Sequence, residues 1–435
     1  MTDARADRPH VVIVGGGVAG IEVATSLGRR VGRRVGRSAA VTLADRSLSH
    51  VWKPMLHTFA AGTARADRQK VDFFAQARRN GFRFQPGALV AVDRAARRVR
   101  LAVEEAEHRP EVEIAYDLLV LAVGSRANDF GTPGVAEHCL TIDDLSEAER
   151  FHREVRRRLL AMLDGQRYLE IAIVGGGATG VELAAELKHA IDLLSAYGAP
   201  DLPGRLRLAL IESGARLLPA FPEHVSRAAA ATLSGLGVEI RTGATVTAAD
   251  AAGFALKDGG RVPAALKVWA AGVKAPDVLA GIDGLERGRA GQLAVGPDLR
   301  TTRDPAILAL GDCAGLADPG TGRPVPATAQ AAHQQARHLA RHLGRNLAAG
   351  RPDAPLPPFR YREKGAVVSL ADFNGWGTLG RYTFGGGRLR GLSARLAHDL
   401  LYRQHQLGLL GIPRGLAAWV LDDVDHLISP PVRLD

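Results

Sequence analysis

Two segments of the chain, residues 10–24 (HVVIVGGGVAGIEVA) and 170–184 (EIAIVGGGATGVELA), repeat one pattern: an apolar strand, a G-x-G-x-x-G turn and the first turns of a helix. In such a turn the first glycine allows a sharp bend out of the strand, the second leaves room for a pyrophosphate, and the third lets helix and strand pack closely. The helix N-terminus offers free N–H groups to the phosphates. These glycines are Gly15, Gly17 and Gly20 in the first segment and Gly175, Gly177 and Gly180 in the second. The pair predicts two dinucleotide-binding units, and hence electron transfer between two cofactors.

An acidic residue ends the second expected strand of each unit, where it can hydrogen-bond a ribose diol. Asp45 closes VTLAD and Glu212 closes LRLALIE. Both follow their fingerprints by more than the usual ~20 residues, so insertions are expected in between. A carboxylate at Glu212 accepts from a 2′-hydroxyl and repels a 2′-phosphate, which predicts NADH rather than NADPH in the second unit.

The length of 435 residues exceeds what one core usually holds, so two or three domains are expected. No targeting segment precedes the first strand, and no uncharged apolar run approaches the length of about 18 residues that spans a membrane. We therefore expect a protein that is made in the cytoplasm and stays on that side. The net charge of +10 comes almost entirely from arginine. An arginine-rich genome explains this excess as well as attraction to an anionic lipid or nucleic-acid surface does.

The chain has two cysteines, Cys139 and Cys313, and no C-x-x-C motif. This excludes the redox-active disulfide of thioredoxin- or glutathione-reductase chemistry and favours two buried thiols. His333 and His338 lie on a basic helix, where lone histidines are mostly solvated. Neither receives a role, and we expect no metal site.

The order of the segments predicts a first domain that is interrupted by the second. A small antiparallel insertion is expected before residue 116 and a β-meander through 261–273. The apolar strand within 307–315 and the amphipathic helix opening near Pro326 are expected to fold back onto the first unit. The fold class is thus α/β, with two Rossmann-like dinucleotide-binding domains, the second inserted in the first, plus a C-terminal region of strands and amphipathic helices. The expected parts are residues 1–142, 143–288, 289–350 and 351–435.

Over roughly residues 10–410 these motifs resemble the type II, single-subunit, non-proton-pumping NADH:quinone oxidoreductases. Four segments are similar to the FAD-binding segments of that family: GGGVAG with Asp45, HVWKPML, LAVGS and LALGDCAG. Three others are similar to its NADH half: VGGGATGVELAAEL, IESGARLLPAF and VWAAGVKA. ATAQAAHQQA resembles the A-Q-x-A-x-Q segment that borders flavin and quinone, and YREKG resembles the Lys-Gly strand beside the flavin ring. Trp52 and Met55 depart from the commoner Phe and Leu.

The resemblance implies an enzyme in which NADH passes a hydride to FAD, and the reduced flavin delivers two electrons and two protons to a membrane quinone. The implied FAD contacts are Gly15, Gly17, Gly20, Asp45, Lys53, Gly124, Asp312 and Ala329. The implied NADH contacts are Gly175, Gly177, Gly180, Glu182, Glu212 and Gly272. The implied catalytic residues are Glu182, Gln330, Gln334 and Lys364.

The catalytic glutamate and glutamines also have plain structural alternatives. Glu182 is expected to position NADH and relay protons; otherwise it is a solvated glutamate stabilised by the helix dipole. Gln330 and Gln334, four residues apart, are expected to hydrogen-bond a quinone carbonyl; otherwise they form the polar face of an exposed helix. The helix N-terminus near Pro326, together with Lys364, is expected to stabilise negative charge on the reduced flavin.

The segment from Arg388 to Arg414 contains five arginines and one aspartate, and its leucines recur on one side of the expected helices. A basic amphipathic segment of this kind suits the head-group layer of an anionic membrane, which predicts peripheral attachment at the cytoplasmic face. The same leucines could instead cover the flavin domain or a second subunit of a homodimer. The leucines are Leu392, Leu396, Leu400, Leu407 and Leu410.

Two other functions remain open. A soluble NADH-dependent FAD reductase that serves a ferredoxin or another protein acceptor needs the same two fingerprints but neither Gln330 nor the C-terminal helices. A flavoprotein that binds nucleic acid through its basic surface is a different class of protein. Nucleic acid is not expected as a partner, because no aromatic–basic interleaving or recognition motif is present.

Overall fold

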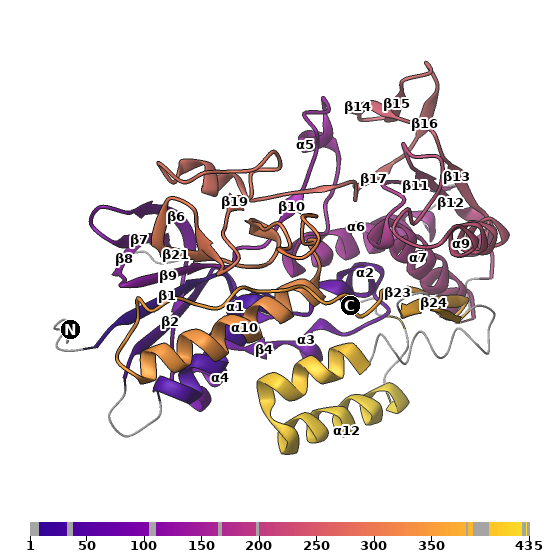
Figure 1. The fold of residues 1–435 in the computed structure, drawn as a ribbon. Helices are drawn as coiled ribbons and strands as arrows, with labels where there is room; N and C mark the ends of the chain where they lie inside the picture. Colours follow the sequence, from indigo (N-terminus) through magenta and orange to yellow (C-terminus); the bar gives the residue numbers. More distant parts are fainter. Residues whose placement is uncertain are drawn as a thin grey trace.

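The computed structural model describes residues 8–32, 38–103, 110–163, 168–196, 200–379, 382–385, 400–428 and 432. Each fingerprint lies at the centre of its own parallel sheet, and the C-terminal helices lie along the bottom of the molecule in the view of Figure 1.

A six-stranded sheet forms the centre of the first unit, in the order β20-β21-β9-β1-β2-β5. All neighbours run parallel except the edge strand β20. All four residues of β9 are buried, as a parallel sheet covered on both faces requires. The strands are β1 His10–Val14, β2 Ala40–Asp45, β5 Arg83–Pro86, β9 Leu118–Leu121, β20 Arg300–Thr301 and β21 Asp304–Ala309.

The second parallel sheet is built from the middle of the chain, in the order β13-β12-β11-β17. Since β21 and β20 follow this sheet in sequence but pair within the first one, the second unit is inserted in the first. The fold class that the sequence predicts is therefore confirmed. The strands are β11 Leu169–Val174, β12 Leu206–Ile211, β13 Val238–Arg241 and β17 Leu266–Trp269.

Three antiparallel sheets accompany these units. The insertion expected before residue 116 is present, but the expected meander through 261–273 is wrong in its second half, because Leu266–Trp269 pairs in parallel with β11. The three sheets are β6 Ala88–Asp93, β7 Arg98–Ala102 and β8 Glu111–Ala115; β14 Val246–Asp250, β15 Gly253–Leu256 and β16 Arg261–Pro263; and β23 Val367–Leu370, β24 Asn374–Leu379 and β25 Tyr382–Gly385.

Strand pairs and 3-10 turns complete the connections. The pairs are β3 Ser49–His50 with β4 Val71–Asp72, β10 Arg126–Ala127 with β18 Val273–Lys274, and β19 Leu293–Ala294 with β22 Ala314–Gly315. The 3-10 turns are η2 Lys53–Met55, η3 Asp277–Gly281 and η4 Gly311–Cys313, and the π-helical turn η1 is Gly28–Gly32.

Helices cover the sheets, and α1 packs against α10 beside the first sheet. The helix predicted to open near Pro326 begins at Ala329, because the Thr328 side chain caps it by accepting from the Ala331 N–H at 3.2 Å. The helices are α1 Val18–Leu27, α2 Leu56–Ala61, α3 Ala66–Gln69, α4 Phe73–Asn80, α5 Val135–His138, α6 Leu145–Leu163, α7 Ala178–Ala196, α8 Leu202–Arg205, α9 Glu223–Gly235, α10 Ala329–Ala348 and α12 Ile412–Ile428.

The C-terminal part ends in two helical stretches, residues 400–410 and α12. Within the described ranges, no helix combines the length and the apolar character needed to cross a bilayer.

Candidate active site

A single continuous cavity of about 1730 Å³ runs from the first fingerprint past the start of α7 to the helical residues 400–405. Its walls come from both parallel-sheet units and from the C-terminal part. The predicted site residues that line it are Gly15, Gly17, Asp45, Lys53, Gly124, Glu182, Gly272, Asp312, Ala329, Gln330, Gln334 and Lys364. The cavity lining does not include Gly20, Gly175, Gly177, Gly180 or Glu212.

The first fingerprint has the geometry of a pyrophosphate cradle. Gly15 has φ +104°, and a Cβ there would lie 2.3 Å from the Ala122 carbonyl oxygen. A Cβ at Gly20 would lie 1.7 Å from the Gly15 oxygen, so helix and strand are in the close contact that only glycine allows. A Cβ at Gly17 meets no atom within 4 Å. The backbone at Gly17 is therefore open toward the cavity, which is the space that the pyrophosphate of FAD needs.

Asp45 closes this cradle from the end of β2. One carboxylate oxygen accepts from the Gly16 N–H at 2.5 Å and the other from the Ser47 N–H at 2.7 Å. Burial raises the pKa of Asp45 above its ordinary value, although both hydrogen bonds act in the opposite direction. The carboxyl group thus fixes the glycine turn and faces the cavity where a ribose is expected.

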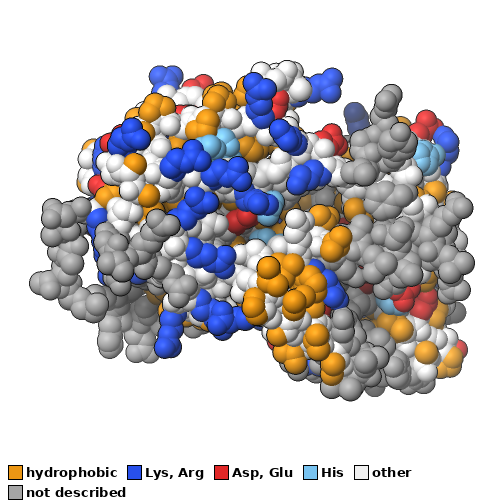
Figure 2. All heavy atoms as spheres, turned by 60° about the horizontal axis from the view of Figure 1, so that its bottom comes forward, with side chains coloured by type: hydrophobic (Ala, Val, Ile, Leu, Met, Phe, Trp, Pro, Cys, Tyr) orange, Lys and Arg blue, Asp and Glu red, His pale blue; other side chains and the backbone are white. Residues whose placement is uncertain are grey.

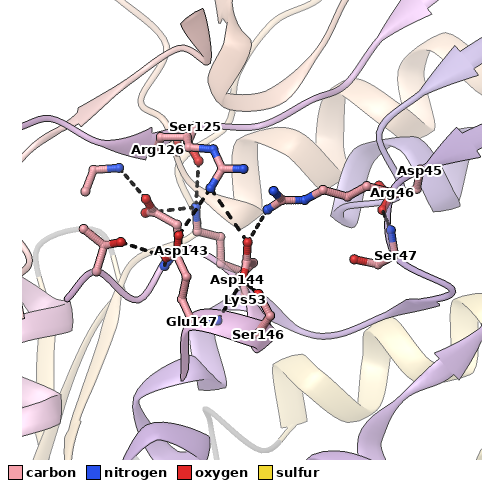
Figure 3. Close-up of polar contacts among 12 residues, drawn as sticks. Asp45, Arg46, Ser47, Lys53, Ser125, Arg126, Asp143, Asp144, Ser146 and Glu147 are labelled. Carbon is pink, nitrogen blue, oxygen red and sulfur yellow. Dashed lines mark hydrogen bonds and ion pairs between the residues drawn. The ribbon is translucent and has the colours of Figure 1, made fainter. Parts of the chain in front are cut away.

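Lys53 anchors the segment that follows β3. Its Nζ donates to the Ser125 carbonyl oxygen at 3.2 Å and lies 4.0 Å from Asp143 Oδ1 (Figure 3). The Ser125 hydroxyl in turn donates to Asp312 Oδ2 at 2.7 Å. Three segments that are far apart in sequence therefore meet at one wall of the cavity.

A second group of charges joins the end of β2 to the start of α6. Asp144 receives a hydrogen bond from Arg46 and lies 3.7 Å from Arg126 Nη1, and Arg126 also contacts Glu147 Oε1 at 3.4 Å (Figure 3). Arg46, Arg126 and Asp144 all line the cavity. This cluster was not predicted from the sequence, where its only local signal is a cation directly after Asp45.

The second fingerprint repeats the geometry of the first. Gly175 has φ +118°, a Cβ at Gly180 would lie 2.0 Å from the Gly175 oxygen, and a Cβ at Gly177 meets no atom within 4 Å. Glu212 accepts from the Gly176 and Gly214 N–H groups, each at 2.6 Å. These residues lie outside the cavity lining, but Ala178 and Thr179, which follow Gly177 directly, are part of it.

Glu182, on the first turns of α7, is buried and faces the cavity. Its Oε1 accepts from the Ser369 N–H at 3.1 Å, and its Oε2 lies 3.6 Å from Nδ1 of the buried His57. Burial raises the pKa of Glu182 to about 8, with a smaller contribution from the nearby Glu186. The alternative of a solvated glutamate is therefore wrong.

His57 is a site residue that the sequence analysis missed. It follows the HVWKPML segment directly, but no motif connects it with the α7 helix more than a hundred residues later. Its contact with Glu182 arises because α2 packs against α7.

Gln330 and Gln334 hold a backbone segment against α10. The Gln330 side chain donates to the Gly365 oxygen at 2.9 Å and accepts from the Lys364 N–H at 2.8 Å. The Gln334 side chain donates to the Arg362 oxygen at 2.8 Å and accepts from the Arg362 N–H at 3.0 Å. The two amides thereby fix residues 362–365 at the cavity, where the Lys364 side chain is exposed.

Both cysteines are free thiols, and burial raises the pKa of each to about 11. Neither thiol is activated as a nucleophile, because the thiolate is the reactive form. The site thus offers two nucleotide cradles and a buried acid, without a dithiol.

These features define a flavoprotein oxidoreductase that uses a pyridine nucleotide. In agreement, residues 9–336 match the pyridine nucleotide-disulphide oxidoreductase family. The chain is 38% identical to the type II NADH:quinone oxidoreductase of Haemophilus influenzae over 98% of this chain and 99% of that protein. It is 27% identical to the enzyme of the same name from Staphylococcus aureus, over 86% of this chain and 90% of that protein.

The chain therefore belongs to the type II NADH:quinone oxidoreductases, flavoprotein enzymes with FAD and NADH as cofactors. Its fold is similar to the solved structure of NDH2 from Plasmodium falciparum in complex with NADH. The TM-score is 0.84 at 18% identity, over 98% of this chain and 100% of that one.

Proposed function

We propose that this enzyme takes electrons from NADH through bound FAD and delivers them to a quinone held in the membrane, without pumping protons. The observation that carries the proposal is the continuity of the cavity, which joins the FAD cradle and Glu182 to the C-terminal helical residues Leu400 and Leu401. These two leucines are 63% and 49% exposed, so the far end of the cavity opens beside an apolar surface. A hydrophobic acceptor can reach the flavin by this route.

When bound, FAD accepts a hydride and returns two electrons. Gly17 and the N-terminus of α1 would bind its pyrophosphate, and Asp45 would bind its ribose. Asp312, which accepts a hydrogen bond from the Ser125 hydroxyl, would bind the ribityl chain. The N-terminus of α10 and Lys364 present positive charge to the cavity, which favours a ring that becomes anionic.

We assign proton handling and the positioning of NADH to Glu182. With its pKa raised to about 8, this carboxyl group carries a proton at neutral pH and can release it within the cavity. Thr179, one helical turn before Glu182, also lines the cavity, and we place the entry of the nicotinamide of NADH at this turn, next to the second fingerprint.

We propose that Gln330 and Gln334 act near the quinone, mainly by holding the backbone that carries Lys364. Because their amide groups bind the backbone of residues 362–365, we assign them to positioning Lys364, together with the predicted quinone contact. Lys364 and Gly365 both line the cavity that the quinone would use.

The membrane surface that we propose is formed mainly by α12. The large exposed apolar side chains of this part are Leu400, Leu401, Ile412, Leu416, Val420, Leu421 and Val424. Figure 2 shows hydrophobic side chains gathered over the C-terminal helices, with Lys and Arg side chains spread over the adjoining face. Apolar insertion next to a basic surface suits peripheral attachment to anionic lipid at the cytoplasmic face.

The outcome for the individual leucines differs from the prediction. Leu410 is partly buried against the hydrophobic core of the first unit, next in sequence to the buried Leu409. The side of this helical stretch that was predicted to be apolar therefore covers the FAD domain in part. Leu407 is half-buried, and only Leu400 is strongly exposed. Leu392 and Leu396 lie outside the described residues. A homodimer remains a prediction.

A stopped-flow comparison tests this function. The purified yellow protein is reduced anaerobically with NADH. It is then mixed with a short-chain quinone or with an oxidised ferredoxin of similar reduction potential. We expect fast flavin reoxidation by the quinone and slow reoxidation by the ferredoxin. Faster reoxidation by the ferredoxin favours the soluble reductase instead.

A second experiment tests the absence of proton pumping. Proteoliposomes that contain the enzyme and a trapped pH indicator should keep a constant internal pH during turnover.

A further inference from the structure

Three potential metal ligands from separate parts of the chain meet between the first unit and the C-terminal helices. Glu22 lies on α1, His333 on α10, and His405 on the helical stretch 400–410. Nδ1 of His333 is 2.7 Å from Glu22 Oε2. One ligand atom from each residue lies within 4.8 Å of the other two. Bound ligands of a four-coordinate zinc ion are about 3–3.5 Å apart, so small side-chain rotations bring all three into range.

The carboxylate of Glu22 is enclosed but incompletely satisfied. Its side chain is 13% exposed, and Oε2 receives no hydrogen bond from the part of the chain that the structure describes. Nδ1 of His333 lies close to this oxygen, but the two atoms do not form a hydrogen bond. A buried carboxylate oxygen without a donor is costly, and a cation between the two groups would satisfy both.

His405 is held in place by a second histidine. Its Nε2 lies 3.0 Å from Nε2 of His50, and Nδ1 of His50 lies 2.9 Å from the Gly16 carbonyl oxygen. Because Nδ1–H of His50 donates to that oxygen, Nε2 of His50 accepts from His405. The other ring nitrogen of His405 then keeps a free lone pair. Metal-binding histidines are oriented in this way by a partner on the opposite nitrogen.

We propose that Glu22, His333 and His405 bind one divalent cation of the zinc class. Two imidazoles and one carboxylate are a usual ligand set for Zn²⁺ that leaves a fourth position open, whereas Mg²⁺ prefers oxygen ligands alone. His333 and His405 line the cavity, so the open position faces it. The cation pins the helical stretch 400–410 to α1 and α10. The histidine that sequence reasoning left without a role becomes a ligand.

The test is a direct measurement of zinc on the full-length, flavin-loaded protein without NADH or quinone. The protein is stripped with a chelator, and Zn²⁺ is then titrated in competition with a fluorescent zinc indicator. We expect one tightly bound Zn²⁺ per chain and no competition from Mg²⁺. Glu22→Gln and His405→Gln should each weaken binding at least about 100-fold, since even partners outside the ligand set are worth 10–100-fold.

A matched control comes from the same helix. The rings of His338 and His342 on α10 are tilted by 46° with centroids 4.7 Å apart, and two histidines four residues apart on a helix can both bind one zinc ion. The double variant His338→Gln/His342→Gln should keep the zinc. Loss of zinc in this variant, undiminished zinc in Glu22→Gln and His405→Gln, or no tight zinc in the wild type would each overturn the proposal.

Thermal unfolding provides a second readout that does not depend on activity. Zn²⁺ should raise the Tm of the wild type and of the control variant, because a ligand that binds only the native state stabilises it. It should leave the Tm of Glu22→Gln unchanged, while the flavin absorbance shows that this variant is folded. Since none of these measurements involves quinone, failure here leaves the proposed function intact.

Discussion

At the scale of single residues, the site depends on three carboxyl groups, of which Asp45 and Glu212 are half-buried and Glu182 is buried. Asp45 and Glu212 were predictable, because each comes at the end of the strand that pairs with the fingerprint strand and accepts from an N–H of the glycine turn. The partners of Glu182 were not, since His57 and Ser369 reach it only after α2 and the C-terminal sheet have packed on α7. Sequence patterns report local geometry, whereas burial and distant partners determine the chemistry of such an acid.

The raised pKa of Glu182 makes stability depend on pH. The acid ionises near its ordinary pKa of 4.5 in the unfolded chain but only near 8 in the folded one. Ionisation therefore favours the unfolded state, and the stability that the neutral acid allows is lost as the pH rises from about 4.5 to 8. Glu182→Gln removes this loss. The Tm of the variant minus the Tm of the wild type should therefore be larger at pH 8 than at pH 5, by at least about 2 °C.

Melting curves at both pH values measure this difference. Glu223→Gln, which removes an exposed carboxylate from α9, is the control for a simple change of surface charge. Parallel shifts of wild type and Glu182→Gln at the two pH values would contradict the buried-acid assignment. The functional role fails if Glu182→Gln leaves both turnover and NADH affinity unchanged.

Glu212 is expected to set the choice of nucleotide. Glu212→Gln keeps the shape of the side chain and removes the charge that repels a 2′-phosphate. The ratio of kcat/KM for NADH to that for NADPH should fall about tenfold, which corresponds to about 1.4 kcal/mol. Glu239→Gln, an exposed change on the neighbouring strand β13, should leave the ratio unchanged. A wild-type preference for NADPH would show that the prediction is wrong.

At the scale of elements, apolar runs and glycine turns predicted most strands and the two βα units correctly. The misplaced element was Leu266–Trp269, because a four-residue strand of sequence LKVW carries no information about whether it pairs with its neighbour or with a distant strand. The start of α10 moved to Ala329 because Thr328, rather than the fixed φ of Pro326, satisfies the first N–H groups. The cluster of Arg46, Arg126 and Asp144 joins separate elements and has no periodic signal.

The two roles of glycine in the first fingerprint can be separated by substitution. Gly17→Ala places a methyl group in open space, so we expect normal folding with flavin retention about tenfold weaker, since the methyl group occupies the pyrophosphate's path. Gly20→Ala forces a Cβ against the Gly15 oxygen and should lower the Tm of the apoprotein itself. The flavin-to-protein absorbance ratio after gel filtration, with apoprotein melting curves, distinguishes them.

The control is Gly177→Ala, the equivalent open position of the second fingerprint. It should retain flavin and raise the KM for NADH. Equal flavin loss in Gly17→Ala and Gly177→Ala would contradict the separate assignment of the two cradles.

At the scale of the whole molecule, the cavity reaches Leu400 and Leu401, two of the exposed apolar residues of the C-terminal helices. The basic amphipathic character of this part was predictable from composition, but the exposed face was not. The exposed face depends on which side of the stretch 400–410 packs against the hydrophobic core of the first unit. Tyr402 and Leu409 lie on the packed side. α12 therefore supplies most of the exposed apolar area.

Liposome flotation tests this surface. Leu416→Ser with Leu421→Ser removes two side chains that are 47% and 65% exposed. Each buried leucine is worth about 1.5 kcal/mol or more, so the double variant should bind anionic vesicles at least about tenfold more weakly. Phe130→Ser with Leu160→Ser, at 66% and 57% exposure elsewhere, should float like wild type. Equal flotation of both double variants would dismiss the α12 surface.

The pairing of β9 with β21 also has a consequence for biosynthesis. β9 ends at Leu121 and β21 begins at Asp304, so the whole inserted unit is translated between them. At about 5–20 residues per second, the ribosome takes ~10–40 seconds to supply the missing neighbour. The inserted unit, which is closed within residues 169–269, can finish folding first. The flavin cradle, which needs both the Gly15 turn and Asp312, is completed only when translation is well into the last third of the chain.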